Sequence, residues 1–173
     1  MKHKLYTSYY DNYDNIPSDW YCVALFNDAP QFMDSVSIRN FLYNHASLFS
    51  PSKELMESFK QNDSKLNKEL EERYLKEVLD NFQQWKKVNQ NFVGPSGEVN
   101  NFIDWINAFD RIIFEQDPEW KNIVFMTSEL PNEDSFRQTF LKLMNYNKIQ
   151  IVELSKEDLS AKKPNQKQIK QLF

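Results

Sequence analysis

Short apolar runs alternate with longer amphipathic segments along this chain, and this alternation restricts the folds that the chain can adopt. The apolar runs are rich in β-branched and aromatic residues, as is typical of strands; they are KLYTSYY (4–10), WYCVALF (20–26), NIVFMTSEL (122–130) and IQIVEL (149–154). The run WYCVALF is apolar at nearly every position, which is expected of a strand buried on both faces of a sheet. The sequence therefore predicts a buried sheet.

The segments between these runs predict helices. Apolar residues recur every three or four positions over 62–92, which indicates one long amphipathic helix; they are Leu66, Leu70, Tyr74, Val78, Phe82 and Trp85. Similar spacing predicts helices over 99–114 and 136–144, and a weaker pattern predicts one over 31–49. Serine before a first-turn proline in SPSKE (50–54) signals the start of a further helix.

The order of the elements is strand, strand, several helices, strand, helix, strand. The closing strand–helix–strand unit predicts a parallel pair joined by a right-handed crossover. We therefore predict an α/β fold, a small three-layer sandwich with a central, largely parallel sheet flanked by helices. One such domain is expected over 1–154, followed by a lysine-rich C-terminal tail over 155–173. A chain of 173 residues can bury enough apolar surface without a disulfide or a structural metal.

The scarcity of glycine and histidine argues against several common kinds of site. A phosphate-binding loop or a dinucleotide fingerprint needs several glycines at fixed spacing before a helix, and this chain has only Gly94 and Gly97. Its two histidines, His3 and His45, stand apart from each other and from any cysteine–acid cluster, which disfavours a zinc site or a Ser-His-Asp triad. We therefore predict neither a metal nor a cofactor.

The net charge and the single cysteine limit which partners and which compartment are expected for this chain. The formal net charge is −4, so no overall field draws the chain to nucleic acid or to an anionic membrane. The one cysteine, Cys22, lies in an apolar run and is expected to be a buried, inert thiol. No segment approaches membrane-spanning length, so a cytoplasmic location is expected. Abundant Asn, Lys, Phe, Tyr and Ile are typical of an AT-rich genome, such as that of a low-GC bacterium or its phage.

Four stretches follow one another in an order that matches a known family. They are the opening strand YTSYY, the second strand and its proline in ALFNDAP, the pair LFSPSKELMESFK and ERYLKEVL, and IVFMTSELPNEDSFRQTFLKLM. In this order and spacing the chain resembles the family called domain of unknown function 488. The last stretch is similar to the family's strand, Glu-x-Pro, Cys-His-Arg group and helix. The resemblance covers most of residues 4–145.

The chain also departs from this family at two polar positions. Where the family carries Cys-His-Arg, this chain has Ser-Phe-Arg at 135–137, so only the arginine is retained. Where the family usually has Ser-Arg before the proline, this chain has Phe26 and Asn27 before Pro30. If the family's cleft does chemistry with a thiol, an imidazole and two guanidinium groups, this chain lacks most of them. The resemblance therefore implies no particular activity.

The loop that joins the third predicted strand to its helix is the candidate binding site. Ligands of α/β proteins bind at such strand–helix junctions, because free backbone N–H groups there attract anions. Arg137 in the first helical turn adds a bidentate donor for phosphate or carboxylate, and Ser135, Glu129, Ser8 and Tyr9 are the candidate neighbours. An alternative stays open, in which Glu129 and Arg137 pair with each other or with solvent and the hydroxyls of Ser8 and Tyr9 are satisfied locally.

The tail ends in a second motif. In QKQIKQLF, Gln166, Ile169, Leu172 and Phe173 have the spacing of the peptides by which replication and repair proteins dock on sliding clamps. The apolar side chains would fill a pocket, and the lysines would steer the tail to an acidic surface. In the alternative, the apolar residues dock back on the domain. The lysines can equally contact nucleic-acid phosphates, in which case binding is weak and salt-sensitive.

Two functions are favoured by these patterns, the first only narrowly. The first is an intracellular interaction or regulatory protein, encoded by a phage or mobile element, that acts on a host or nucleic-acid-metabolism complex. The alternative is a nucleotide- or nucleic-acid-binding enzyme that uses the anion site around Arg137. A structural scaffold or oligomer is a third hypothesis, and whether the chain is an enzyme stays open.

Overall fold

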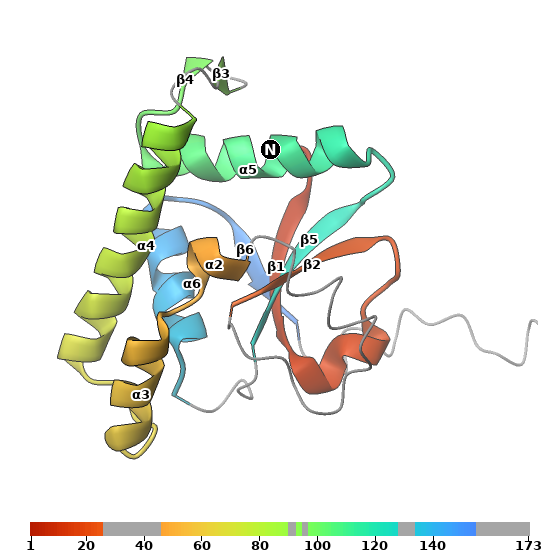
Figure 1. Cartoon of the computed structure of the whole chain (residues 1–173). Coiled ribbons are helices and arrows are strands. Elements are labelled where there is room, and N and C mark those ends of the chain that lie inside the picture. The colour runs from red at the N-terminus through yellow and green to blue at the C-terminus, as the bar shows by residue number, and fades with distance from the viewer. Residues whose placement is uncertain (26–45, 90–92, 95–96, 128–133, 155–173) are drawn as a thin grey trace, which may run out of the picture.

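Four parallel strands form the main sheet, in the order β2-β5-β1-β6 (Figure 1). The computed structural model describes residues 1–25, 46–89, 93–94, 97–127 and 134–154. The strands are β1 (Lys4–Tyr9), β2 (Trp20–Ala24), β5 (Asn122–Thr127) and β6 (Ile151–Glu153). Each lies within a run that the sequence predicted to be a strand.

The pairing of the strands corrects one prediction. The closing strand–helix–strand unit was expected to form a parallel pair, but β5 and β6 do not pair with each other. Strand β1 lies between them, and Thr7 is the register partner of both Phe125 and Glu153. The two last strands are parallel, and the helix between them crosses over β1.

The helices lie on one side of this sheet (Figure 1). They are α2 (Ala46–Phe49), α3 (Lys53–Gln61), α4 (Lys68–Val88), α5 (Phe102–Gln116) and α6 (Phe136–Tyr146). The opposite face is covered by a short 3₁₀ helix, η1 (Tyr10–Asn15). The sheet with its cover on each face is the predicted small α/β sandwich. Most of the predicted helix over 31–49 lies outside the described residues.

Side-chain caps begin three of the helices. Ser52, Asn67 and Asn101 each precede a helix, and each side-chain oxygen accepts a hydrogen bond from a backbone N–H three residues later. Such a bond satisfies one of the amides that a helix N-terminus leaves without a partner. Ser52, rather than Ser50 beside Pro51, caps α3, and its hydroxyl also lies 2.7 Å from Glu77 Oε1 on α4.

Two small elements were missed by the sequence analysis. The segment that follows β1 was expected to be a turn, and it forms η1. The glycine-containing segment after α4 forms a two-stranded antiparallel ladder of β3 (Val93–Gly94) and β4 (Gly97–Glu98). Both elements are too short to produce a hydrophobic periodicity, so pattern analysis cannot detect them.

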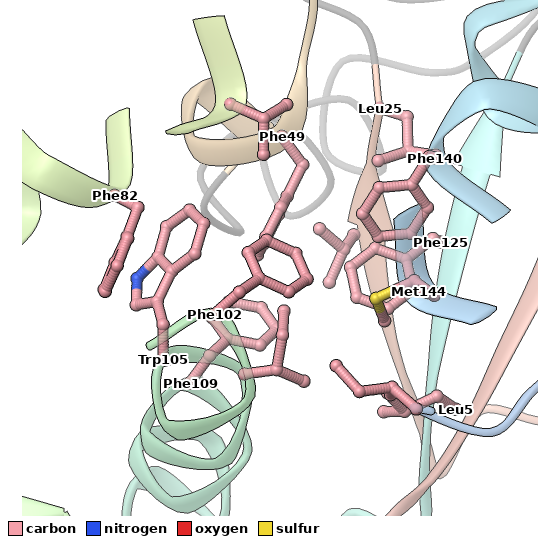
Figure 2. Packing of buried hydrophobic residues seen from close by; sticks show 14 of the residues in the cluster. Leu5, Leu25, Phe49, Phe82, Phe102, Trp105, Phe109, Phe125, Phe140 and Met144 are labelled. Carbon is pink, nitrogen blue, oxygen red and sulfur yellow. The ribbon is translucent and has the colours of Figure 1, made fainter. Parts of the chain in front are cut away.

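Phe49 lies at the centre of an aromatic cluster between the helices and the sheet (Figure 2). Its ring centroid lies 5.1 Å from that of Trp105, 5.3 Å from Phe109, 5.5 Å from Phe125 and 5.7 Å from Phe140. Tilted and edge-on aromatic pairs of this kind contribute about 0.5–1.5 kcal/mol each beyond their buried area. One side chain from the short helix α2 thus joins α5, α6 and β5.

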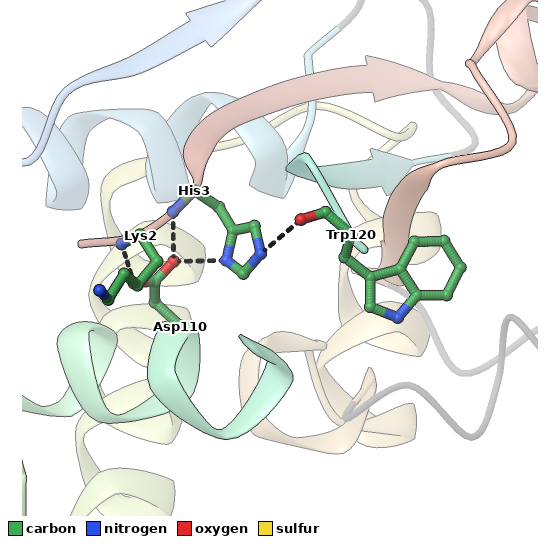
Figure 3. A network of polar contacts seen from close by, with 4 residues as sticks. All are labelled: Lys2, His3, Asp110 and Trp120. Carbon is green, nitrogen blue, oxygen red and sulfur yellow. Dashed lines mark hydrogen bonds and ion pairs between the residues drawn. The ribbon is translucent and has the colours of Figure 1, made fainter. Parts of the chain in front are cut away.

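A charged network closes the edge of the sheet where the strands begin (Figure 3). Asp110 on α5 accepts hydrogen bonds from the backbone amides of Lys2 and His3, and its Oδ1 lies 2.8 Å from His3 Nδ1. The other ring nitrogen, Nε2, lies 3.0 Å from the carbonyl oxygen of Trp120. Both ring nitrogens thus face protein oxygens. This histidine–carboxylate pair therefore anchors the chain and leaves no ring nitrogen for a substrate.

Candidate functional site

The connections that follow β1 and β5 leave the sheet on opposite faces. After β1, Tyr10 and Tyr13 of η1 pack with Val124 and Met126 on one face. After β5, helix α6 packs against the other face, where it contributes to the cluster around Phe49. In open α/β sheets, ligands bind outside the carboxyl ends of two neighbouring strands whose connections diverge in this way. In this molecule that place lies between β1 and β5.

Buried polar side chains gather at the same place. Six of the ten buried polar residues in the described parts of the chain lie toward the carboxyl ends of β1 and β5, in η1, or at the start of α6; they are Thr7, Ser8, Asn12, Thr127, Ser135 and Arg137. Burial of a polar group costs free energy unless a hydrogen bond compensates for it. The region around the carboxyl ends of these strands therefore has more buried polar side chains than the rest of the core.

On the face toward the helices, these groups surround an ion pair. Arg137 Nη2 on α6 lies 2.9 Å from Oε1 of Glu153 on β6. Alternation along the strands places Thr7, Tyr9 and Thr127 on the same face as Glu153. The Arg137 side chain is fully buried, whereas that of Glu153 is 42% exposed. The guanidinium is thus fixed inside the molecule and its carboxylate partner lies at the boundary with solvent.

The first turn of α6 adds a local positive potential. Ser135 is the N-cap residue of α6 and has an extended backbone, but its side chain makes no capping hydrogen bond. Ser135 Oγ and Thr7 Oγ1 are both buried and have no hydrogen-bond partner within the described part of the chain. The amides of a helix N-terminus and its dipole favour an anion nearby. This corner therefore combines a cation, a helix N-terminus and two hydroxyls that have hydrogen-bonding capacity left.

The candidate residues from β1 separate onto two faces. Tyr9 is on the helix-facing side with Arg137, whereas Ser8 points to the side of η1. There Ser8 Oγ accepts a hydrogen bond from Asn12 Nδ2 at 3.0 Å, and Asn15 Nδ2 donates to Asn12 Oδ1 at 3.0 Å. The structure thus brings Tyr9, Ser135 and Arg137 to one face and places Ser8 in a separate polar chain.

Glu153 was not among the candidates, although the sequence holds a signal for it. Ile149, Ile151 and Glu153 alternate along the last strand, so a carboxylate occupies a position where the pattern expects an apolar side chain. A lone charge on the buried side of a strand needs a partner. The alternative in which Arg137 pairs with Glu129 stays untested, because Glu129 lies outside the described residues. The pair that the structure describes is with Glu153.

The remaining predicted groups lie elsewhere or outside the described residues. The tail residues Gln166, Ile169, Leu172 and Phe173 fall outside them, so the sliding-clamp hypothesis stays a prediction. Cys22 lies on β2, and its burial raises the pKa of the thiol to about 12. In the described segments, no group of three His, Cys, Asp or Glu side chains is placed to hold a metal ion.

Comparisons with known proteins do not assign the chain to a group. No family model matches the sequence, and neither a curated protein nor a solved structure is detectably similar to it. The resemblance to domain of unknown function 488 therefore stays a prediction. None of the described helices combines the length and the apolar character needed to cross a membrane.

Proposed function

We propose that this protein binds a small anionic molecule at the carboxyl-end edge of its sheet, between β1 and the start of α6. The observation that carries this proposal is the gathering of buried polar side chains where the connections of β1 and β5 diverge. Two of these side chains, Thr7 and Ser135, have hydroxyls without a hydrogen-bond partner in the described part of the chain, and an unpaired buried polar group destabilises a fold. Polar groups that are retained at a position where α/β proteins bind ligands favour recognition.

Each group has a defined part in this proposal. Arg137 supplies a planar guanidinium that can donate two parallel hydrogen bonds to an oxyanion. The dipole of α6 favours an anion near its N-terminus, and the hydroxyls of Ser135 and Thr7 supply hydrogen bonds to other ligand atoms. His3 and Cys22 lie away from this corner and take no part. The proposal is therefore one of binding, with nucleotides and other phosphate-bearing metabolites as the first ligands to test.

The test is ligand-dependent thermal stability in the presence of inorganic phosphate and adenine nucleotides. A ligand at one hundred times its Kd stabilises a protein by about 2.7 kcal/mol. For a chain of this size that corresponds to a rise in Tm of about 5–10 °C. We expect such a rise for the wild type and none for Arg137→Gln. Ionic strength is held constant with sodium chloride.

A matched arginine provides the control. Arg111 also pairs with a glutamate, Glu115, but both side chains lie at the surface of α5. We expect Arg111→Gln to keep the full ligand-dependent rise. Because Arg137→Gln removes a buried charge, its own Tm can fall, and only the change on adding ligand is compared. An equal change in Arg137→Gln and wild type, or none in wild type, contradicts the proposal.

A further inference from the structure

We infer that the Glu153 carboxylate is a built-in competitor at the Arg137 site, and that it makes this site select phosphoryl groups over carboxylates. This inference rests on the proposed function and names the class of its ligand. Glu153 Oε1 lies 2.9 Å from Arg137 Nη2, so one carboxylate already occupies a position that a ligand oxyanion would take. The side chain of Glu153 thus stands in for the ligand's charged group.

The burial of the two partners shows which of them can leave. Arg137 is fully buried on α6, whereas the Glu153 side chain is 42% exposed on the three-residue strand β6. Removing the buried guanidinium from the interior is costly, but the carboxylate can rotate into water, where it is well solvated. An incoming anion therefore exchanges with Glu153 while Arg137 stays in place.

Because Glu153 competes for Arg137, the charge of a ligand determines whether the ligand can displace it. A monocarboxylate would replace one carboxylate by another of equal charge, while Glu153 stays tethered nearby at a high effective concentration. A phosphoryl group carries about −1.5 to −2 charges near pH 7 and three strong acceptor oxygens. The larger charge interacts more strongly with Arg137 and with the N-terminus of α6. The phosphoryl group therefore displaces Glu153 where a carboxylate does not.

Two hydroxyls, one beside Glu153 on the sheet and one two residues before Arg137 in the chain, can bind additional oxygens. Thr7 is the register partner of Glu153, so their side chains lie side by side on the helix-facing side of the sheet. Thr7 Oγ1 and Ser135 Oγ are fully buried and have no hydrogen-bond partner within the described part of the chain. Glu153 forms an ion pair with Arg137 without engaging either hydroxyl. A phosphoryl group presents oxygens to which both hydroxyls can donate.

The experiment measures binding of inorganic phosphate and of acetate by wild type and Glu153→Gln, by titration calorimetry at constant ionic strength. If the Arg137 site is free of Glu153 for about one-tenth of the time, the observed Kd is about tenfold weaker than the intrinsic one. We therefore expect phosphate to bind Glu153→Gln about tenfold more tightly than wild type. Acetate is expected to bind the variant and not the wild type. Glu115→Gln, in the exposed pair with Arg111, should bind as the wild type does.

The outcomes separate this inference from the proposed function. If phosphate binds wild type and Glu153→Gln equally tightly, Glu153 does not compete, and the inference fails while the proposed function stands. If neither anion binds either protein, the proposed function fails and the inference fails with it. Should Glu153→Gln not fold without its charge, Glu153→Asp keeps the charge on a shorter side chain, and it too is expected to bind phosphate more tightly. An unchanged affinity in that variant overturns the inference.

Discussion

At the scale of single residues, Cys22 shows how a strand position determines reactivity. Its side chain packs in the cluster under η1, where Trp20 and Val124 are buried. Burial disfavours the thiolate and raises the pKa from its ordinary value of 9.0 to about 12. The thiol therefore stays protonated at neutral pH, although Cys22 is partly exposed and not fully buried as the sequence predicted.

The raised pKa of Cys22 has a consequence for stability. Above pH 9 the unfolded chain loses the thiol proton and the folded chain keeps it, so the free energy of unfolding falls as pH rises toward 12. We expect wild type to lose about 1.4 kcal/mol per pH unit more than Cys22→Ala in this window. Urea denaturation of both proteins from pH 8 to pH 11 checks this. Tyr21 and Tyr74 also have raised pKa values, but they are common to both proteins and cancel. Parallel curves for the two proteins would contradict the prediction.

At the scale of elements, the caps of α4 and α6 differ in what they do. Asn67 Oδ1 accepts a hydrogen bond from Leu70 N at 2.9 Å, whereas Ser135 Oγ makes no such bond. We expect Asn67→Ala to lower the free energy of unfolding by about 1 kcal/mol. Ser135→Ala removes a buried hydroxyl that lacks a partner in the described residues, so it should be neutral or stabilising. Chemical denaturation measures both changes.

The same serine variant should lose function while it keeps stability. Removing the hydroxyl of Ser135 is expected to weaken phosphate binding, whereas Asn67→Ala should leave phosphate binding unchanged below its Tm. A cost of about 1 kcal/mol for Ser135→Ala would instead show that its hydroxyl caps α6 in solution. Groups that are kept against stability are typical of binding sites.

The helices and strands could be predicted from the sequence, but the pairing of the strands could not. Leu70, Tyr74, Val78 and Phe82 recur at helical spacing, and all four are buried on α4 as predicted. Strand pairing has no such local signature, because β1 meets β5 and β6 only after the chain has crossed the sheet. The same limit applies to the candidate site. The place of Arg137 in the first turn of α6 followed from local pattern, whereas its partner Glu153 lies on another strand.

At the scale of the whole molecule, the amino ends and the carboxyl ends of the parallel strands differ in their polar groups. At the edge where the strands begin, Asp110 and His3 are paired with each other and with backbone groups. At the edge where the strands end, Thr7 and Ser135 keep hydroxyls without partners in the described part of the chain. We interpret the polar groups at the amino ends of the strands as stabilising the fold, and those at the carboxyl ends as binding a ligand.

This division predicts separate effects of substitution. Asp110→Asn replaces a buried carboxylate oxygen with an amide that faces donors, so the free energy of unfolding should fall by about 3 kcal/mol or more. Asp80→Asn, at an exposed position on α4, should change it by about 0.5 kcal/mol at most. Urea denaturation gives both values. The folded Asp110→Asn protein should still bind phosphate with the affinity of wild type, and a loss of binding there would show that the two edges are coupled.

The central position of β1 also bears on how this protein is made. Both strands that pair with β1 lie near the other end of the described chain, after α5 and after α6. During synthesis at about 5–20 residues per second, the first strand therefore waits several seconds with both of its edges unpaired. In that interval its backbone can pair with the wrong segment or with another nascent chain. A ribosome-bound helper that shields the first strand should therefore raise the yield of native protein more than stabilising the finished fold would.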